Sequence, residues 1–345
     1  MRLTLIPILA ISATLSLRAQ PVLTPAQVRG LLTALAHDSM AGRATGTPGA
    51  AKAARLIADA MQRAGIAPAG DSGYFQRVAL VLDATTGRGG RAGGPPVRRQ
   101  SFRVLPSLAD LDTVPAARHT AAVNVVGIIR GNDPSLAAEH VLVDAHYDHI
   151  GIGTPVNGDS IYNGADDDAS GTVAVLEVAR QIAAGPPPRR TIVFMTTIGE
   201  ERGLLGTRWY IAHPLIPLSQ MVANLEIEMI GRPDSLAGGS GRAWLTGYER
   251  STMGDGFAAA GIPIVPDKRP DQQFFQRSDN IAFARIGIPA HTLSSFNLHT
   301  DYHRPSDDVD KVDFDHMTAV INAAARAVRL LSDGPKPEWK PGGRP

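Results

Sequence analysis

The chain lacks cysteine entirely, and its acidic and basic residues nearly cancel. Without a thiol it cannot form a disulfide, bind a metal through sulfur or attack a substrate with a cysteine nucleophile. Its 34 Lys and Arg against 33 Asp and Glu leave no field of one sign to attract nucleic acid or an anionic membrane. The function therefore depends on a local site, where any metal must be held by His, Asp or Glu.

Long apolar runs are also scarce. The segment from Leu3 to Leu17 is apolar, Arg2 precedes it, and Ala19 or Gln20 marks the expected cleavage point, so residues 1–20 are predicted to be an export signal. The protein is accordingly expected to be exported, to the periplasm or outside the cell. A buried N-terminal helix is the alternative interpretation. No other segment of the sequence is long and apolar enough to predict a membrane span.

The length of 345 residues fits one large α/β domain with extensions. Beyond Ala121 strand-like and helix-like stretches alternate, which predicts a mostly parallel, mixed central sheet with helices on both faces. The single domain is assigned to residues 21–333. A flexible loop rich in Gly, Arg and Pro is expected near 85–99, and a disordered tail at 334–345. The loop has no interleaved aromatic residues, so nucleic-acid binding is not expected there.

The pattern of apolar residues predicts where the helices and strands lie. Two amphipathic helices are expected between Thr24 and Ala67. Further strands are expected at 124–129, 141–145, 191–197, 221–229, 243–246 and 290–293, and helices at 170–183, 204–212, 251–260 and 314–331. In open sheets of this kind, ligands bind beyond the carboxyl ends of the strands. His146, Glu200 and Glu228 fall at such ends.

Acidic and imidazole side chains gather in short motifs, several of which follow these strands. The motifs are Ala145-His146-Tyr147-Asp148, Asp166-Asp167-Asp168, Glu200-Glu201, Glu226-Ile227-Glu228 and Asp301-Tyr302-His303. Carboxylates at the ends of apolar strands are costly to desolvate without partners or cations, so together the motifs predict a site for two metal ions. Taken singly, each also fits an ordinary role, such as a structural histidine, a helix-capping aspartate or an exposed acidic pair.

The individual motifs suggest different chemical roles for their residues. The Asp148 carboxylate is expected to accept the second ring proton of His146 and so fix its tautomer. Of the adjacent Glu200 and Glu201, one can ligate a metal while the other acts as a base toward the attacking water. Glu226 and Glu228 are two residues apart on one strand and share a face, so either can reach the site.

Taken together, the motifs resemble the zinc aminopeptidases of metallopeptidase clan MH, whose relatives include secreted bacterial leucine aminopeptidases and glutamate carboxypeptidases. The resemblance covers roughly residues 25–332 and includes Gly42-Arg43-x-x-Gly46, Gly73-Tyr74-Phe75-Gln76 and Arg277-Ser278-Asp279-Asn280. It implies the zinc-exopeptidase fold, of the phosphorylase/hydrolase-like type, and two Zn²⁺ ions in each chain.

The resemblance also implies roles for single residues. Glu200 would be the general base and Tyr302 the donor to the oxyanion, and the peptide bond that follows the shared aspartate is often cis in this family. One position departs from the pattern, because Glu228 stands where the family usually has Asp. The implied metal ligands are His146, Asp167, Glu201, Glu228 and His303, with Asp167 bridging the two ions.

These roles point to a metal-dependent exopeptidase that hydrolyses the N-terminal peptide bond of peptides with a free amino group. A carboxylate-rich site suits that amine. The alternatives are a glutaminyl cyclase-like enzyme with a single zinc, a carboxypeptidase or other amide metallohydrolase of the clan, and a non-enzymatic relative that has lost its metals. Cyclases typically have Trp-His where this chain has Tyr302-His303.

Overall fold

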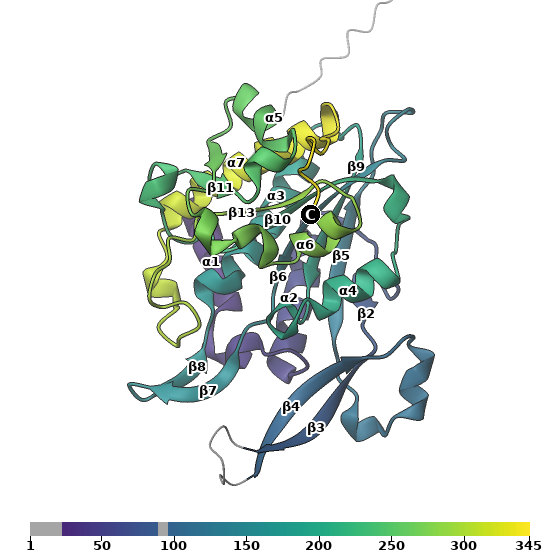
Figure 1. Cartoon of the computed structure of the whole chain (residues 1–345), viewed down its shortest axis with the longest axis vertical. Helices are drawn as coiled ribbons and strands as arrows, with labels where there is room; N and C mark the ends of the chain where they lie inside the picture. The colour runs from purple at the N-terminus through teal and green to yellow at the C-terminus, as the bar shows by residue number, and fades with distance from the viewer. Residues whose placement is uncertain (1–22, 89–95) are drawn as a thin grey trace, which may run out of the picture.

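The computed structural model of the chain describes residues 23–88 and 96–345. Within these residues nine strands form a central sheet in the order β1-β5-β9-β6-β10-β13-β11-β12, with β2 paired to β5 (Figure 1). The strands of this sheet are β1 (Ala67–Pro68), β2 (Phe75–Arg77), β5 (Val123–Ile129), β6 (His140–His146), β9 (Thr191–Thr197), β10 (Met221–Ile227), β11 (Ala243–Leu245), β12 (Ile264–Pro266) and β13 (Ala290–Ser294).

The middle of the sheet is parallel and its flanks are mixed. Strand β6 runs parallel to β9 and β10, and β10 runs parallel to β13. Strands β5 and β11 run antiparallel to β9 and β13. The predicted mostly parallel, mixed sheet is therefore confirmed, and the four parallel strands end at one edge.

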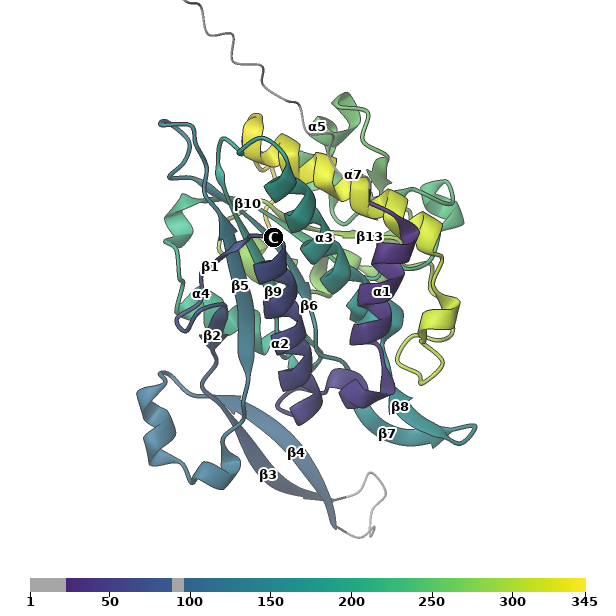
Figure 2. The same cartoon turned by 180° about the vertical axis from the view of Figure 1, so that it is seen from behind.

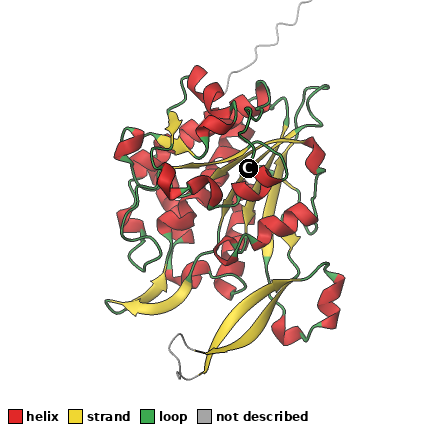
Figure 3. Ribbon diagram, viewed as in Figure 1, coloured by secondary structure: helices red, strands yellow, loops and turns green. Residues whose placement is uncertain are grey.

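Helices cover both faces of the sheet. Helices α1, α2, α3 and α7 lie on one face (Figure 2), and α4 and α6 lie on the other (Figures 1 and 3). Their bounds, with α5 near the edge strand β12, are α1 (Pro25–Leu35), α2 (Pro48–Arg63), α3 (Gly171–Ala184), α4 (Leu205–Ala212), α5 (Met253–Ala259), α6 (Asn280–Arg285) and α7 (Phe314–Asp333). None of the helices in the described part of the chain has the length and apolarity needed to cross a membrane.

The first two helices begin where the sequence places capping residues. Thr24 caps α1 in a capping box with Gln27, and Pro25 occupies the first turn. Thr47 accepts a hydrogen bond from the amide of Ala50 at the start of α2. The cap at Thr47 fixes the end of the loop, between α1 and α2, that carries Arg43 toward the sheet.

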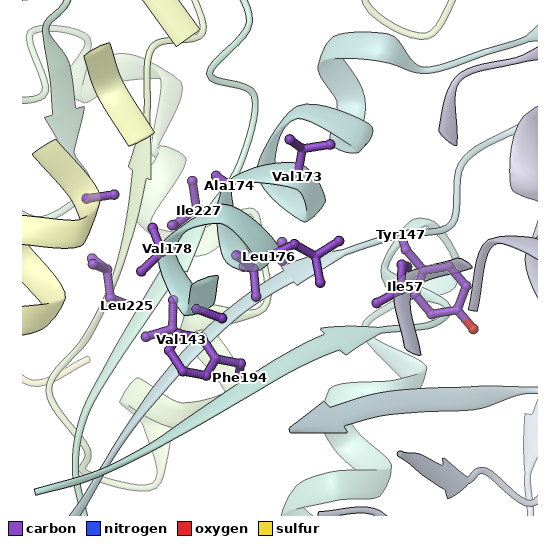
Figure 4. Close-up of a cluster of buried hydrophobic side chains, with 14 of the residues drawn as sticks. Ile57, Val143, Tyr147, Val173, Ala174, Leu176, Val178, Phe194, Leu225 and Ile227 are labelled. Atoms are coloured by element: carbon purple, nitrogen blue, oxygen red, sulfur yellow. The ribbon is translucent and has the colours of Figure 1, made fainter. Parts of the chain in front are cut away.

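The core lies between the sheet and α3, α7 and α2. Every residue of β6 and β9 is buried, so neither strand shows an alternating pattern, as expected for strands covered on both faces. Figure 4 shows the cluster at the contact of α3 with the strands, where the labelled side chains are Ile57, Val143, Tyr147, Val173, Ala174, Leu176, Val178, Phe194, Leu225 and Ile227.

Two segments that the sequence analysis expects to be loose are ordered in part or in full. Strand β3 (Leu80–Arg88) pairs antiparallel with β4 (Pro96–Val104), forming an arm away from the main sheet (Figure 1). The prediction of a flexible loop near 85–99 is therefore wrong for the parts that lie in these strands, because a strand can be held by its partner's backbone without apolar side chains. Residues 89–95, like the predicted signal at 1–20, lie outside the described residues.

The C-terminal segment 334–345 packs against the domain, so the prediction of a disordered tail is wrong. The indole of Trp339 donates to the carbonyl of Gly287 and lies near Phe275 and His291. The amide of Lys340 donates to the carbonyl of Arg250. A single large aromatic anchors a segment whose Pro and Gly content alone predicts disorder.

Candidate metal centre

The candidate site lies at the edge where the parallel strands end. His146 is the last residue of β6, Glu200 and Glu201 follow β9 in a 3-10 turn, and Glu228 follows β10 directly. Asp167 comes from the turn Ala165–Ser170 that leads into α3. Since neighbouring parallel strands finish at the same edge, these side chains are brought together by topology.

A first cluster consists of His146, Asp167 and Glu228. The Nε2 atom of His146 lies 3.4 Å from Oδ1 of Asp167 and 3.8 Å from Oε1 of Glu228. Glu228 thus places a carboxylate oxygen in this cluster, although its side chain is one methylene longer than that of the aspartate expected there. Strand β10 ends one residue before Glu228, so this residue lies past the end of the strand.

A second cluster consists of Asp167, Glu201 and His303. The Nε2 atom of His303 lies 3.0 Å from Oδ2 of Asp167 and 3.3 Å from Oε1 of Glu201. Asp167 therefore presents one carboxylate oxygen to each cluster. The Asp167-Asp168 peptide bond is cis, as the family resemblance leads one to expect.

The donor atoms of both clusters fit divalent metal ions. Buried polar atoms are normally hydrogen-bonded, and leaving them unpaired is costly. Imidazole nitrogens and carboxylate oxygens are also the ligands that zinc accepts in a site without cysteine. Among the described residues, the buried atoms without a hydrogen-bond partner include His146 Nε2, His149 Nδ1, Asp167 Oδ2 and Glu201 Oε1.

The three consecutive aspartates have three different environments. Oδ1 of Asp168 accepts from the amides of Gly171 and Met229, which ties the start of α3 to the end of β10. Asp166 accepts from the amide of Gly231 and from the imidazole of His299. Only the middle residue of the three faces both clusters, and its neighbours serve as braces for the loops around it.

Two acidic residues lie differently from what the sequence suggests. The ring of His146 contacts the backbone carbonyl of Asp148 at 3.1 Å, whereas the nearest carboxylate oxygen of Asp148 is 3.9 Å away. That carboxylate instead accepts from Thr45 and from the amide of Gly199, so the prediction that it takes the ring proton is wrong. The sequence could not predict this arrangement, because both donors come from segments far from Asp148 in the chain.

Glu226 does not reach either cluster. It is fully buried and accepts from the hydroxyls of Ser278 and Thr292 and from the amides of Asp279 and Asn280. Glu226 belongs to β10 itself, whereas Glu228 lies past the end of the strand. The carboxylate of Glu226 therefore holds the start of α6, and Glu228 is the one that faces the site.

The protein contains a brace beneath the site that sequence reasoning recognised only as part of a motif. Arg43 is fully buried and donates to the carbonyls of Tyr147, Asn163 and Gly164, and also to Leu35 in α1. These bonds join the loop after β6 to the turn that carries Asp167. A guanidinium is suited to this role because it offers five donors in a fixed plane.

Glu200 and Tyr302 line the pocket that opens onto the clusters. Burial, and then the nearby charges of Glu228 and Asp279, raises the pKa of Glu200 well above its usual value. Burial, together with the charge of Asp167, also raises the pKa of the Tyr302 hydroxyl. Tyr302 therefore keeps its proton at neutral pH and can donate it in a hydrogen bond.

Aromatic side chains also line this pocket. Trp244 stacks on Phe274 with ring centroids 5.0 Å apart, and Phe296 meets Phe274 edge to face at 5.9 Å. The guanidinium of Arg277 lies 5.1 Å above the ring of Phe274. The lining of the pocket thus combines acidic and aromatic side chains with the guanidinium of Arg277.

Comparison with known proteins identifies the family. Residues 124–328, more than half of the chain, match peptidase family M28. The chain belongs to this family. Together with the donor clusters, this membership makes the M28 domain a metallopeptidase domain, as the sequence motifs predict.

The curated relatives match over part of their length. The chain is 25% identical over 218 residues to a vacuolar membrane protease of Botryotinia fuckeliana, an alignment that covers 62% of this chain and 18% of that protein. The M28 chain thus spans about a fifth of the length of the curated relatives it matches.

Solved structures share the fold. The zinc aminopeptidase BSAP from Bacillus subtilis superposes with a TM-score of 0.63 at 16% identity, covering 92% of this chain and 97% of that chain. The glutaminyl cyclase of Porphyromonas gingivalis superposes with a TM-score of 0.56 at 14% identity, covering 89% and 98%. The predicted zinc-exopeptidase fold is confirmed, and at these identities the likeness concerns the fold alone.

The relatives correct the expected location. The sequence analysis predicts export to the periplasm or outside the cell from residues 1–20. The curated relatives are instead proteases of the vacuolar membrane. This finding overturns the prediction, and a periplasmic or secreted location is wrong.

Proposed function

We propose that this M28 peptidase is an aminopeptidase with two zinc ions, one in each cluster. The observation that carries the proposal is the position of Asp167, which has one carboxylate oxygen in each cluster. His146 and Glu228 would complete the first site, and Glu201 and His303 the second. The similarity in fold to a zinc aminopeptidase supports the choice of metal and reaction.

When bound, a pair of zinc ions supplies a nucleophilic water at neutral pH and polarises the scissile carbonyl. Glu200 accepts the proton of the attacking water and passes it to the departing amine. Tyr302 donates a hydrogen bond to the oxygen on which negative charge develops. The Asp148 carboxylate holds the amides of Gly199 and Glu200, which fixes the turn that carries the base.

The lining of the pocket supports the choice of an N-terminal substrate. Carboxylates of Glu200 and Glu228 line the pocket beside the clusters, where they attract the ammonium group of a free N-terminus. The aromatic side chains of Trp244, Phe274 and Phe296 offer apolar contact to the side chain of the first residue.

The proposal is tested with pairs of peptides that differ only at the N-terminus. The free peptide should lose its first residue, the N-acetylated peptide should remain intact, and a chelator should stop the reaction until zinc is added back. Cleavage of the acetylated peptide from its C-terminus would contradict an aminopeptidase. Release of ammonia from a peptide that begins with glutamine, without hydrolysis of any peptide bond, would instead indicate a cyclase.

A further inference from the structure

A third histidine lies beside the metal centre, and neither the five-ligand pattern nor the mechanism uses it. His149 follows β6 by three residues and is fully buried. Its Nδ1 atom lies 2.9 Å from Oε1 of Glu201 and 3.7 Å from Oδ2 of Asp167. These are the same two oxygens that His303 approaches in the second cluster.

The contact between His149 and Glu201 is not an ordinary hydrogen bond. A separation of 2.9 Å is short enough for one, yet neither His149 Nδ1 nor Glu201 Oε1 has a hydrogen-bond partner within the described part of the chain. Both atoms are therefore close together, buried and left without a hydrogen-bond partner, which is costly unless something else compensates them. A cation bound by both atoms would supply that compensation.

The spacing comes within about 0.4 Å of that expected around a shared ion. Ligand atoms about 2.0–2.2 Å from a zinc ion and at tetrahedral angles lie about 3.3–3.6 Å from one another. The measured separations from His149 to Glu201 and Asp167 are 2.9 and 3.7 Å, and those from His303 to the same residues are 3.3 and 3.0 Å.

The ring of His149 is held in this position from behind. A Cβ atom on Gly164 would lie 2.5 Å from the imidazole, so only glycine leaves room for the ring there. The amide of His149 donates to the carbonyl of Arg43, whose side chain in turn holds the carbonyl of Gly164. The brace beneath the site therefore also fixes this histidine.

We propose that His149 is a further protein ligand of the second metal site, bound through Nδ1. The inference rests on the proposed two-ion centre and deepens it. It gives the second site four protein ligands, Asp167, Glu201, His303 and His149, against three in the first site. Sites with three protein ligands keep a position open for water or substrate, so the first site becomes the open one and the second the tightly held one.

The test measures zinc affinity in the full chain, by competition with a chromogenic chelator that resolves two dissociation constants. The constant that His303→Ala weakens marks the second site. His149→Ala and the bulkier His149→Gln should both weaken that constant by more than the about 10- to 100-fold that loss of an outer-shell partner costs, and leave the other constant unchanged. Cobalt in the second site should also change its visible spectrum, since a ligand has been lost.

His140→Ala is the matched control. His140 is also fully buried with both ring nitrogens unpartnered among the described residues, but it lies at the opposite end of β6. This variant should bind both ions as the wild type does, which separates loss of a ligand from loss of a buried histidine. Circular dichroism of each variant checks that it folds.

Three results would overturn a part of this picture. Wild-type affinity in both His149 variants would exclude the ligand. A lowered affinity with an unchanged cobalt spectrum would make His149 a positioning residue and also exclude ligation. Binding of two ions that depends on His149, in a protein that cleaves no peptide, would overturn the proposed function and leave this inference standing.

Discussion

The two halves of the metal centre are built in different ways. The first cluster takes His146 from the end of β6 and Glu228 from the end of β10, two strands that pair directly in the sheet. The second takes Glu201 from a 3-10 turn and His303 from a loop after β13. The sheet thus positions the first half by register, whereas the second half depends on side chains that tie loops together.

The brace for the second half is a network around Arg232. Its guanidinium contacts Asp301 at 2.7 Å and Asp307 at 3.5 Å. Asp307 in turn accepts from the amides of Asp166 and Asp167. The loop that carries His303 is therefore joined to the turn that carries the shared aspartate. The comparison predicts that the two sites respond separately to substitution.

The largest effect is expected from Glu200→Gln, which leaves both clusters intact. Loss of the base should lower kcat by about 10²- to 10⁴-fold, because the amide cannot accept the proton of the attacking water. Elemental analysis should still find the wild-type metal content. Retained turnover would remove Glu200 as the base, and loss of metal would place it among the ligands.

Tyr302→Phe removes a hydroxyl that neither cluster needs. The variant should lose about 10²- to 10³-fold in kcat, since a donor to the developing oxyanion is missing. KM and zinc affinity should change little, and steady-state kinetics with a zinc titration measures all three. A large rise in KM at constant kcat would instead assign the phenol to substrate binding.

Glu228→Asp tests the first cluster, whose ligands are positioned by the pairing of β6 with β10. Because the shorter side chain falls back from the position that Glu228 Oε1 now occupies, zinc affinity of the first site should fall about 10- to 100-fold. The second site should keep its affinity. An unchanged pair of dissociation constants would mean that the end of β10 adjusts freely, contrary to the comparison.

Arg232→Ala tests the second cluster, whose ligands Glu201 and His303 are positioned by loops. Without its contacts to Asp301 and Asp307, the loop that carries His303 should become less ordered, and zinc affinity of the second site should fall about tenfold. Lys311→Ala, which removes only an exposed ion pair with Asp310, is the control and should change neither constant. Equal weakening of both sites would show that the halves are not independent.

His291 provides the smallest effect and a contrast to the histidines of the centre. It is fully buried, contacts Ser251 and Thr246, and burial lowers its pKa from 6.5 to about 4. Below about pH 6.5 the unfolded chain therefore binds a proton at His291, whereas the folded chain does not. Between pH 7 and 5.5 this costs about 1 kcal/mol of stability, and the loss continues down to about pH 4.

Urea unfolding of the wild type and of His291→Gln at pH 7 and 5.5 measures this loss. The variant cannot titrate in this range, so its stability should fall less than that of the wild type over the same interval. Identical slopes in the two proteins would mean that His291 does not hold the lowered pKa.

The regular elements were largely predictable because their signals are local. Strand β9 and the start of α7 lie where the apolar pattern places them, and the caps at Thr24 and Thr47 mark the starts of the first helices. The arm of β3 and β4 and the docking of Trp339 were missed, because each depends on a distant partner. The composition of a segment does not show which distant residues that segment contacts in the fold.

The sequence by itself determined the parallel sheet, the position of the acidic and imidazole motifs at its edge and, through their order, the family. Only the tertiary structure decided which ligand atoms face one another. It showed that Asp167, and not Asp166 or Asp168, faces both clusters, and that Glu228, and not Glu226, reaches the site. It also showed that the backbone of Asp148, and not its carboxylate, contacts His146, and that His149 lies beside Glu201. The reason is physical: residue type fixes which ligand an atom can be, whereas loop geometry and competing hydrogen bonds fix where that atom points.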